Sequence, residues 1–243
     1  MRMLTFAKRN FKEIMRDPLN LSFLFGFPVV LLLLLSAIQA NIPVSLFEIE
    51  SLAPGTAVFG LAFMTLFSAT VIAKDRQSSF MHRLYTTPMT PVDFILGYTL
   101  PMIPIALAEG VATYIFAVIL GLQIGVNILL AVIFIIPVAV LYIAIGLLCG
   151  SVFNDKQVGG ICGALLTNLS AWLSGIWFDL ELVGGAFKEI AYALPFVHAV
   201  EMERAVIAGS VSDALPHLLW VAGYAAVILT AAVLVFLRRM KRQ

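Results

Sequence analysis

Charged residues are scarce in this chain: they make up 12% of its 243 residues, whereas hydrophobic residues make up 61%. A soluble domain carries about 25% charged residues, so this scarcity excludes an ordinary soluble protein and a disordered chain. The chain also lacks a basic excess, because 15 lysines and arginines face 14 acids, and we expect no nucleic-acid partner. The two cysteines, Cys149 and Cys162, are too few for a disulfide framework.

The usual signatures of enzymes are also missing. No Gly-Lys pair occurs anywhere, so the chain has no phosphate-binding loop of the G-x-x-x-x-G-K-[ST] type. It has neither a G-x-S-x-G elbow nor an H-E-x-x-H motif. Its three histidines, His82, His198 and His217, lie in predicted loops or at the edge of an apolar run. The sequence therefore predicts no catalytic residue, no metal site and no cofactor bound by this chain.

Six long apolar runs are present instead. A helix that crosses a bilayer needs about 20 apolar residues, and each run is of about that length. The predicted fold class is an all-α membrane protein, a single transmembrane domain over residues 1–243 with six transmembrane helices. The predicted spans are Leu21–Ile38, Gly55–Ala73, Ile95–Leu120, Ile128–Cys149, Val158–Phe178 and His217–Leu237.

The distribution of lysine and arginine predicts the orientation of these spans. Thirteen of the basic residues lie in the N-terminal segment, the second and fourth connections and the C-terminal tail, and two lie in the fifth connection. Connections rich in lysine and arginine face the cytoplasm. Both termini and Ser78–Pro91 are therefore predicted to be cytoplasmic, and Asp179–Pro216 is predicted to lie outside.

Two segments outside the spans are predicted to form short helices. Met1–Asp17 has apolar residues at helical spacing opposite lysines and arginines, so we expect an amphipathic helix in the membrane interface, ended by Pro18; a frayed polar tail is the alternative. Asp179–Pro216 contains two apolar runs too short to span. We expect two short helices, Phe187–Leu194 and Val197–Ile207, that dip into the outer leaflet or cap the bundle, and an ordinary surface loop is the alternative.

Glu109 is the one ionisable residue predicted well inside a span. A carboxylate there costs several kcal/mol unless it faces protein or water. Glu109 is therefore a candidate for a substrate path or for a seam between two copies. The alternative is a structural acid that is bonded to hydroxyl groups such as those of Thr113 or Tyr114.

Small residues are concentrated in the predicted fourth and fifth spans. Gly146 and Gly150 are four residues apart, as are Gly159 and Gly163. This spacing lets membrane helices approach closely, although glycine is common in such helices in any case.

The second connection has the composition of a partner-binding surface. Asp75–Tyr85 is predicted to form a short helix at the cytoplasmic face, because Thr87-Pro88 ends it and Pro91 prevents a quick restart. An apolar patch beside two arginines suits a groove on a partner protein. A helix buried among lipid headgroups is the alternative. The candidate contact residues are Arg76, Phe80, Met81, Arg83, Leu84 and Tyr85.

Several stretches resemble the membrane subunit of type-2 ABC exporters, over nearly the whole chain. The run after the second span resembles the family pattern R-L-x-x-T-P-[LMV]-[ST], and Leu96-Gly97 follows it as in the family, with Tyr98 in place of the usual Lys. The chain departs from the family at Ser79-Phe80-Met81, where an acid followed by Gly-Thr-Leu is usual, and at Asp179, where Pro is common. The similar stretches are Arg83-Leu84-Tyr85-Thr86-Thr87-Pro88-Met89-Thr90, Leu173-Ser174-Gly175-Ile176-Trp177-Phe178 and Ala193-Leu194-Pro195-Phe196-Val197-His198-Ala199.

The resemblance implies a division of labour in the cytoplasmic membrane of a prokaryote. The chain would be one of two permease copies, as a homodimer in the lipid bilayer, and two copies of a separate ABC ATPase subunit would carry ATP and Mg. Asp75–Tyr85 would be the coupling helix. ATP binding would shift the permeases from inward-open towards outward-open. The outer gate implied by the resemblance would comprise Phe178, Pro195, Phe196 and His198.

Two other functions remain open on the sequence. An ATP-independent secondary transporter or channel has only Glu109 for ion coupling, and residues 1–120 and 121–243 show no convincing internal similarity. A membrane scaffold without transport activity is the other function that remains open. A co-purifying ATPase would separate the exporter from both. With one charge inside the membrane, an amphiphilic or apolar cargo is favoured over a large polar sugar.

Overall fold

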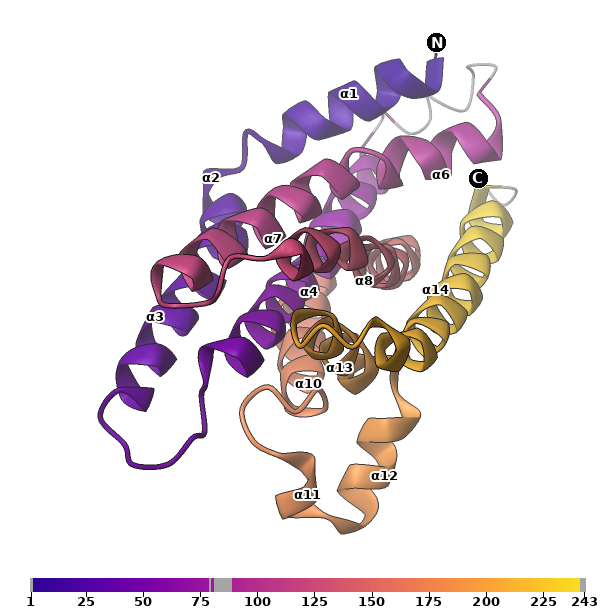
Figure 1. Ribbon diagram of the computed structural model, residues 1–243. Helices are drawn as coiled ribbons and strands as arrows, with labels where there is room; N and C mark the ends of the chain where they lie inside the picture. Colours follow the sequence, from indigo (N-terminus) through magenta and orange to yellow (C-terminus); the bar gives the residue numbers. More distant parts are fainter. Residues whose placement is uncertain (1, 79, 81–88, 241–243) are drawn as a thin grey trace.

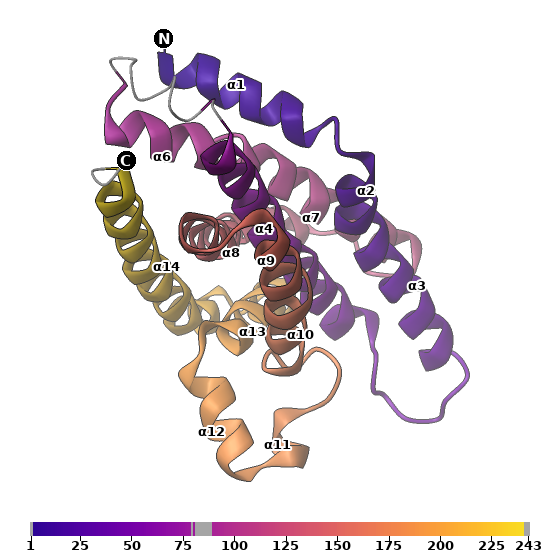
Figure 2. The ribbon, with the colours of Figure 1, turned by 180° about the vertical axis from the view of Figure 1, so that it is seen from behind.

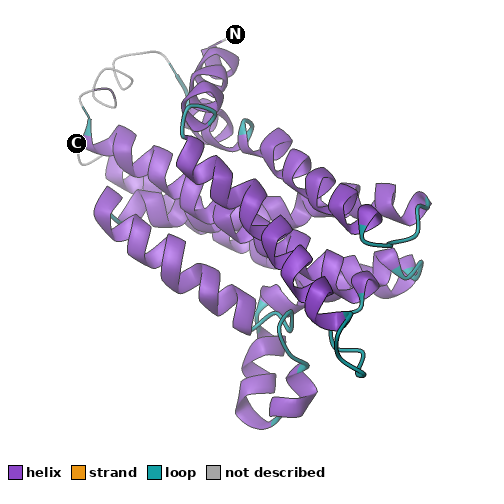
Figure 3. Ribbon diagram, turned by 90° about the vertical axis from the view of Figure 1, so that its left-hand side faces the viewer, coloured by secondary structure: helices purple, strands orange, loops and turns teal. Residues whose placement is uncertain are grey.

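The computed structural model describes residues 2–78, 80 and 89–240, and these residues form helices and no strand, which confirms the all-α class. Both chain termini lie at the same end of the bundle, together with α1 (Arg2–Ile14), and we call this the proximal end (Figure 1). At the opposite, distal end, α11 (Leu180–Val183) and α12 (Gly185–Ala193) project beyond the other helices (Figure 2). Figure 3 shows that long helices fill the space between these ends.

Five helical stretches in the described part of the chain are long and apolar enough to cross a membrane. Each overlaps one of the predicted spans. The first joins α2 (Pro18–Leu21), the π-helix η1 (Ser22–Gly26) and α3 (Phe27–Gln39), and the others are α4 (Ile49–Gln77), α6 (Pro91–Thr99) with α7 (Met102–Ile119), α8 (Val126–Val152) and α14 (Val211–Met240).

The remaining predicted span, Val158–Phe178, is not among these five stretches of the described chain. The helix in this region consists of α9 (Asp155–Val158), the π-helix η2 (Gly159–Leu166) and α10 (Thr167–Trp172). It therefore ends before Phe178. The chain then turns at Gly175, whose φ of +70° is a left-handed conformation in which an α-helix does not continue. The count of six spans stays a prediction.

The third predicted span, Ile95–Leu120, is not one uninterrupted helix. It breaks between α6 and α7 at Leu100 and Pro101, because a proline ring clashes with the preceding helical turn and has no N–H to donate. Both halves contact α4, but α6 lies beside α1 at the proximal end (Figure 1), whereas α7 packs against α3 and α8. The break therefore lets the two halves reach different neighbours besides α4.

Helix α4 forms the centre of the bundle, because every residue from 52 to 65 is buried. Its closest neighbour is α8. A Cβ atom on Gly146 of α8 would lie 1.7 Å from Oγ of Ser68, and one on Gly150 would lie 2.6 Å from the carbonyl oxygen of Ala69. Glycine at these two positions therefore allows the close approach. At Gly159, by contrast, an added Cβ would meet no described atom within 4 Å.

The connection between α10 and α14 contains the short helices α11 and α12 and the longer α13 (Pro195–Ile207). Pro195 occupies the first turn of α13, where its missing N–H costs nothing. α13 is largely buried, and it packs against α14, α4 and α8. This connection therefore places one of its helices inside the bundle instead of leaving it on the surface.

Candidate functional site

At the proximal end, an ion pair ties α1 to the last turns of α4. The Arg9 guanidinium donates to both carboxylate oxygens of Asp75, at 2.7 and 2.8 Å, and the Tyr98 hydroxyl of α6 donates to the same carboxylate at 3.0 Å. Burial opposes the charged form of Arg9, but the hydrogen bond to Asp75 and its charge outweigh this effect, so the pKa of Arg9 is raised. The pair fixes the positions of α1, α4 and α6.

Aromatic rings surround this ion pair. The Phe6 ring of α1 lies 4.9 Å from the Tyr98 ring and 6.4 Å from the Phe80 ring, centre to centre. The Arg9 guanidinium lies 4.4 Å from the centre of the Phe80 ring, a cation–π contact. Phe6 fits here because Gly97 has no side chain, since a Cβ on Gly97 would lie 2.3 Å from a ring carbon of Phe6.

The candidate ATPase contacts are placed only in part. Arg76 donates to the carbonyl of Gly150 at 2.6 Å, so its guanidinium joins α4 to α8 within the chain. Phe80 is half-buried in the aromatic cluster. The other four residues, Met81, Arg83, Leu84 and Tyr85, lie outside the described residues.

The predicted start of the coupling helix at Asp75 requires a correction. Asp75, Arg76 and Gln77 form the last turn of α4, which ends at Gln77. The side chains of Asp75 and Arg76 bind α1 and α8, and these bonds hold the turn onto the bundle. A separate surface helix therefore does not include these three residues.

The solvent-facing side of α1 is basic. Lys8 and Lys12 are exposed, and they lie beside a shallow groove of about 460 Å³. Anionic groups are attracted to such a row of cations. The residues that line this groove are Thr5, Lys8, Arg9, Lys12, Glu13 and Arg16.

Midway along α7, Glu109 is completely buried, with 0% exposure. Its Oε1 accepts a hydrogen bond of 3.0 Å from Thr113, one of the two hydroxyl partners expected if the acid is structural. Tyr114 donates instead to Oε2 of Glu203, at 2.9 Å. The substrate path or seam at Glu109 stays a prediction.

Glu203 is a buried acid that the sequence analysis did not single out. It lies in α13, has 0% exposure, and burial raises the pKa of its carboxyl to about 8. It was overlooked because it falls in a predicted outer connection. One signal was available: Glu203 is three residues after Val200 and three before Val206, on the apolar face of that helix.

A cavity of about 730 Å³ opens at the distal end, between α13, the start of α4 and the segment that follows α10. Arg204 of α13 holds these walls together. It donates to Glu201 at 2.9 Å, to the carbonyl of Gly175 at 3.1 Å and to the carbonyl of Ser51 at 3.3 Å. Phe178 lines the same cavity.

The four candidate outer-gate residues are not gathered at one place. Phe178 lines the distal cavity, and Pro195 forms the first turn of α13. Phe196 stacks on the Tyr142 ring of α8, with 6.2 Å between ring centres. His198 faces α14, so the candidate residues on α13 contact different neighbours from Phe178 and from one another.

His198 and His217 form a contact between α13 and α14, with 2.8 Å between their Nδ1 atoms. The Nε2 atom of His198 lies 3.0 Å from the carbonyl of Tyr192, and since a carbonyl only accepts, Nε2 carries a proton. In neutral His198 the Nδ1 atom then accepts from His217. Burial lowers the pKa of His198, which favours this neutral arrangement.

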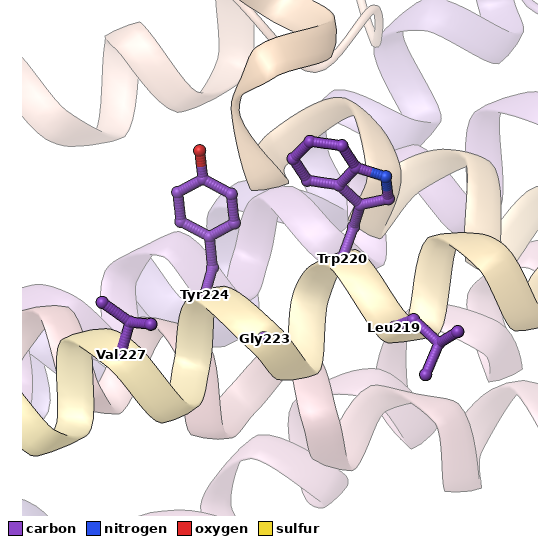
Figure 4. Close-up of a pocket in the computed structure, with 5 residues that line it drawn as sticks. All are labelled: Leu219, Trp220, Gly223, Tyr224 and Val227. Carbon is purple, nitrogen blue, oxygen red and sulfur yellow. The ribbon is translucent and has the colours of Figure 1, made fainter.

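An apolar groove of about 510 Å³ runs along the exposed side of α14. Figure 4 shows the rings of Trp220 and Tyr224 standing on the same side of the helix. The Tyr224 hydroxyl donates to the carbonyl of Ala193 at 2.6 Å, so its polar end is satisfied. The lining residues are Leu219, Trp220, Gly223, Tyr224 and Val227.

Comparison with known protein families decides what kind of membrane protein carries these features. The family model described as ABC-2 type transporter matches residues 1–208. The chain belongs to the ABC-2 type transporter family. No curated protein matches the chain. The family match extends from α1 to the end of α13, and it includes the Arg9–Asp75 pair and both buried acids.

Membership in the ABC-2 family has direct consequences for the chain. It is an integral membrane protein and the transmembrane part of an ABC transporter. It is a permease component and not a catalytic one, and it associates with an ABC ATPase. In this chain the Arg9–Asp75 pair lies at the proximal end, Glu109 lies midway along α7, and the cavity lined by Arg204 lies at the distal end.

Proposed function

We propose that two copies of this chain form the membrane pore of an ATP-driven exporter, with a separate ATPase subunit bound to each copy. The observation that carries the proposal is the ABC-2 family match over residues 1–208. The missing phosphate-binding loop agrees with it, because a chain without that loop needs a partner to bind ATP and Mg. A substrate then moves outward when the ATPase pair closes.

In this proposal the proximal end faces the cytoplasm of a prokaryotic cell and the distal end faces outward. The supporting observation is the charge distribution, with thirteen basic residues on one side and two on the other. Six spans are proposed, namely the five long helical stretches and Val158–Phe178. An even number of spans places both termini at the same end, as they lie in Figure 1.

The ATPase is proposed to dock at the proximal end beside Phe80. Phe80 rests on Phe6 and Arg9 of α1, and Arg9 is bonded to Asp75 of α4. A displacement of Phe80 on ATPase binding would therefore be transmitted to both α1 and α4. The remaining proposed contacts are Arg76, Met81, Arg83, Leu84 and Tyr85.

The distal cavity is the proposed exit, with Phe178, Pro195, Phe196 and His198 as its gate. Phe178 lines the cavity, and the other three lie on α13, which carries Arg204 into the cavity wall. Movement of α13 would therefore change the cavity and the positions of these residues together. The proposed cargo is amphiphilic or apolar, because Glu109 is the one charged residue in the predicted spans.

The test is co-purification with an ABC ATPase whose gene lies beside that of this chain. The permease and the ATPase are expressed together, and co-elution and ATP hydrolysis are measured in detergent for the wild type and for the double variant Phe80→Ala, Tyr85→Ala. Truncation of an interface anchor costs about 2 kcal/mol or more, so we expect binding to weaken by more than about 25-fold.

The matched control is Leu182→Ala, because Leu182 lies at the distal end and is 79% exposed. This variant is expected to bind the ATPase as the wild type does. Each permease is first shown to be monodisperse. A monodisperse double variant that still binds and stimulates the ATPase at wild-type levels refutes the docking assignment, and a wild-type chain that binds no ABC ATPase refutes the exporter.

An ATP-independent secondary transporter is the second candidate, and the buried acids favour it, because α7 and α13 together supply two carboxyl groups within the bundle instead of one. Transport by vesicles that contain the permease without any ATPase would support this function. Transport that requires both the ATPase and ATP supports the exporter.

A further inference from the structure

Two fully buried carboxyl groups lie on α7 and α13, and a hydrogen bond joins these helices. Glu109 of α7 and Glu203 of α13 each have 0% exposure, and the Tyr114 hydroxyl of α7 donates to Glu203 at 2.9 Å. Each has one satisfied oxygen, through Thr113 and Tyr114. The other oxygen of each carboxyl, Oε2 of Glu109 and Oε1 of Glu203, has no hydrogen-bond partner among the described residues.

The charged groups around this pair do not neutralise it. The groups bonded to the two acids are the hydroxyls of Thr113 and Tyr114, which carry no charge. The neighbouring cation, Arg204, is bonded to groups at the distal cavity. On the other helices that pack against α13, Tyr142 of α8 is bonded to Ser170, and His217 of α14 is bonded to His198.

Two ionised carboxylates are therefore unfavourable in this position. Moving an unpaired charge into an apolar interior costs far more than a protein's net stability, and two like charges side by side raise the cost further. Of two acids that share such a site, at least one takes up a proton. The pKa of Glu203, raised to about 8 by burial, agrees with this argument from geometry.

The room at the site limits what can neutralise the acids. Oε1 of Glu109 packs directly against the backbone of α4, because a Cβ added to Gly60 would lie 2.0 Å from it. The ring of Pro28 of α3 also lies against this position, with its Cγ 2.8 Å from the Cβ added to Gly60. A hydrated metal ion or an organic cation needs a cavity, whereas a proton needs none.

We propose that Glu109 and Glu203 form a proton-binding site that joins α7 to α13. The proton comes from water and converts one carboxylate into a neutral carboxylic acid, which removes the repulsion between the two acids. The bound proton holds α13 against α7, and its release favours their separation. Proton binding and the position of α13 are therefore linked, since each changes the free energy of the other.

The first test is infrared spectroscopy of the purified permease between pH 6 and pH 9. We expect the carbonyl band of a protonated carboxylic acid at pH 6, and we expect it to decline as the pH rises through about 8. Glu203→Gln and Glu109→Gln keep hydrogen-bonding groups in place, and each is expected to remove or shift this band. Glu189→Gln is the control, because Glu189 is exposed on α12, and it is expected to leave the band unchanged.

The second test is thermal unfolding of the same proteins. A neutral amide has no proton to lose, so the stability of Glu203→Gln is expected to change less with pH than that of the wild type. The wild type loses about tenfold in the unfolding equilibrium for each pH unit below its folded pKa of about 8, so the advantage in Tm of Glu203→Gln is expected to grow by roughly 5 °C or more from pH 6 to pH 8 and to level off above pH 8.

A wild-type spectrum with no protonated carboxyl band between pH 6 and 7.5 overturns the proposal, and this result needs no variant. A band that survives unchanged in both Gln variants also overturns it, because the proton then lies elsewhere. Both measurements use the permease without an ATPase, so a failed proton site is distinguishable from a failed exporter assignment.

Discussion

At the scale of single residues, the ion pair between Arg9 and Asp75 carries the first prediction. Asp75→Asn removes the charge from a position that is 2% exposed and leaves Arg9 with a weaker partner. We expect a loss of about 1–3 kcal/mol in the free energy of unfolding. The loss should be closer to 1 than to 3 kcal/mol, because Arg9 is 36% exposed and water weakens its pairing with Asp75. Thermal unfolding in detergent measures this loss.

The control for this prediction lies on the same helix as Arg9. Glu13 also pairs with Arg9, at 2.7 Å, but both side chains of that pair are 36% exposed. An exposed pair contributes little, so Glu13→Gln is expected to cost less than about 0.5 kcal/mol. Equal losses in Asp75→Asn and Glu13→Gln would contradict the role assigned to Asp75.

At the scale of helices, the contact between α4 and α8 carries the second prediction. A Cβ on Gly150 would lie 2.6 Å from the carbonyl oxygen of Ala69, and a backbone atom cannot move aside as a flexible side chain can. Gly150→Ala is therefore expected to force the helices apart and to cost about 1–3 kcal/mol. Thermal unfolding and size-exclusion chromatography measure the effect.

Gly160→Ala is the matched control, because the added methyl group would meet no described atom within 4 Å. Alanine favours a helix over glycine, so this variant is expected to be neutral or stabilising by up to about 1 kcal/mol. If Gly150→Ala is as stable as Gly160→Ala, the close approach of α4 and α8 is not required.

The contact between α13 and α14 gives a prediction about pH. Burial lowers the pKa of His198 below its value of 6.5 in the unfolded chain, so its contribution to stability is complete above pH 6.5 and is lost as the pH falls through the folded value. We expect Tm of the wild type to fall between pH 7.5 and 5.5 by at least about 2 °C more than that of His198→Asn. If Tm falls by the same amount in the wild type and in His198→Asn, the titration of His198 does not contribute to this pH dependence.

At the scale of the whole molecule, the prediction concerns which way the bundle lies in the membrane. Gln77 at the end of α4 and Ser212 at the start of α14 are exposed at opposite ends. In a background where the buried Cys149 and Cys162 are replaced by alanine, single cysteines at these positions are labelled with an impermeant maleimide. We expect labelling in intact cells at Ser212→Cys and, after permeabilisation only, at Gln77→Cys. The reverse labelling pattern would show that the orientation in the membrane is opposite to the one proposed.

Much of the architecture could be predicted from the sequence, because it depends on local free energies. Long apolar runs are stable in a bilayer wherever their neighbours lie, which is why five of the expected spans overlap the long helices of the structure. The ABC-2 family could be predicted from short stretches such as Arg83–Thr90, and the family match confirmed it. Local composition also predicted Glu109 as an unusual buried acid.

The tertiary structure alone decided which residues meet. Glu203 lies 89 residues from Tyr114 in the sequence, and only the packing of α13 within the bundle brings its carboxyl group to the Tyr114 hydroxyl of α7. The Arg9–Asp75 pair likewise joins two distant segments. Apolar periodicity fixes a helix and its buried face but not the neighbour that the face contacts, since many neighbours bury a similar area. Shape and polar pairing, as at Gly150 and Asp75, select one neighbour from among them.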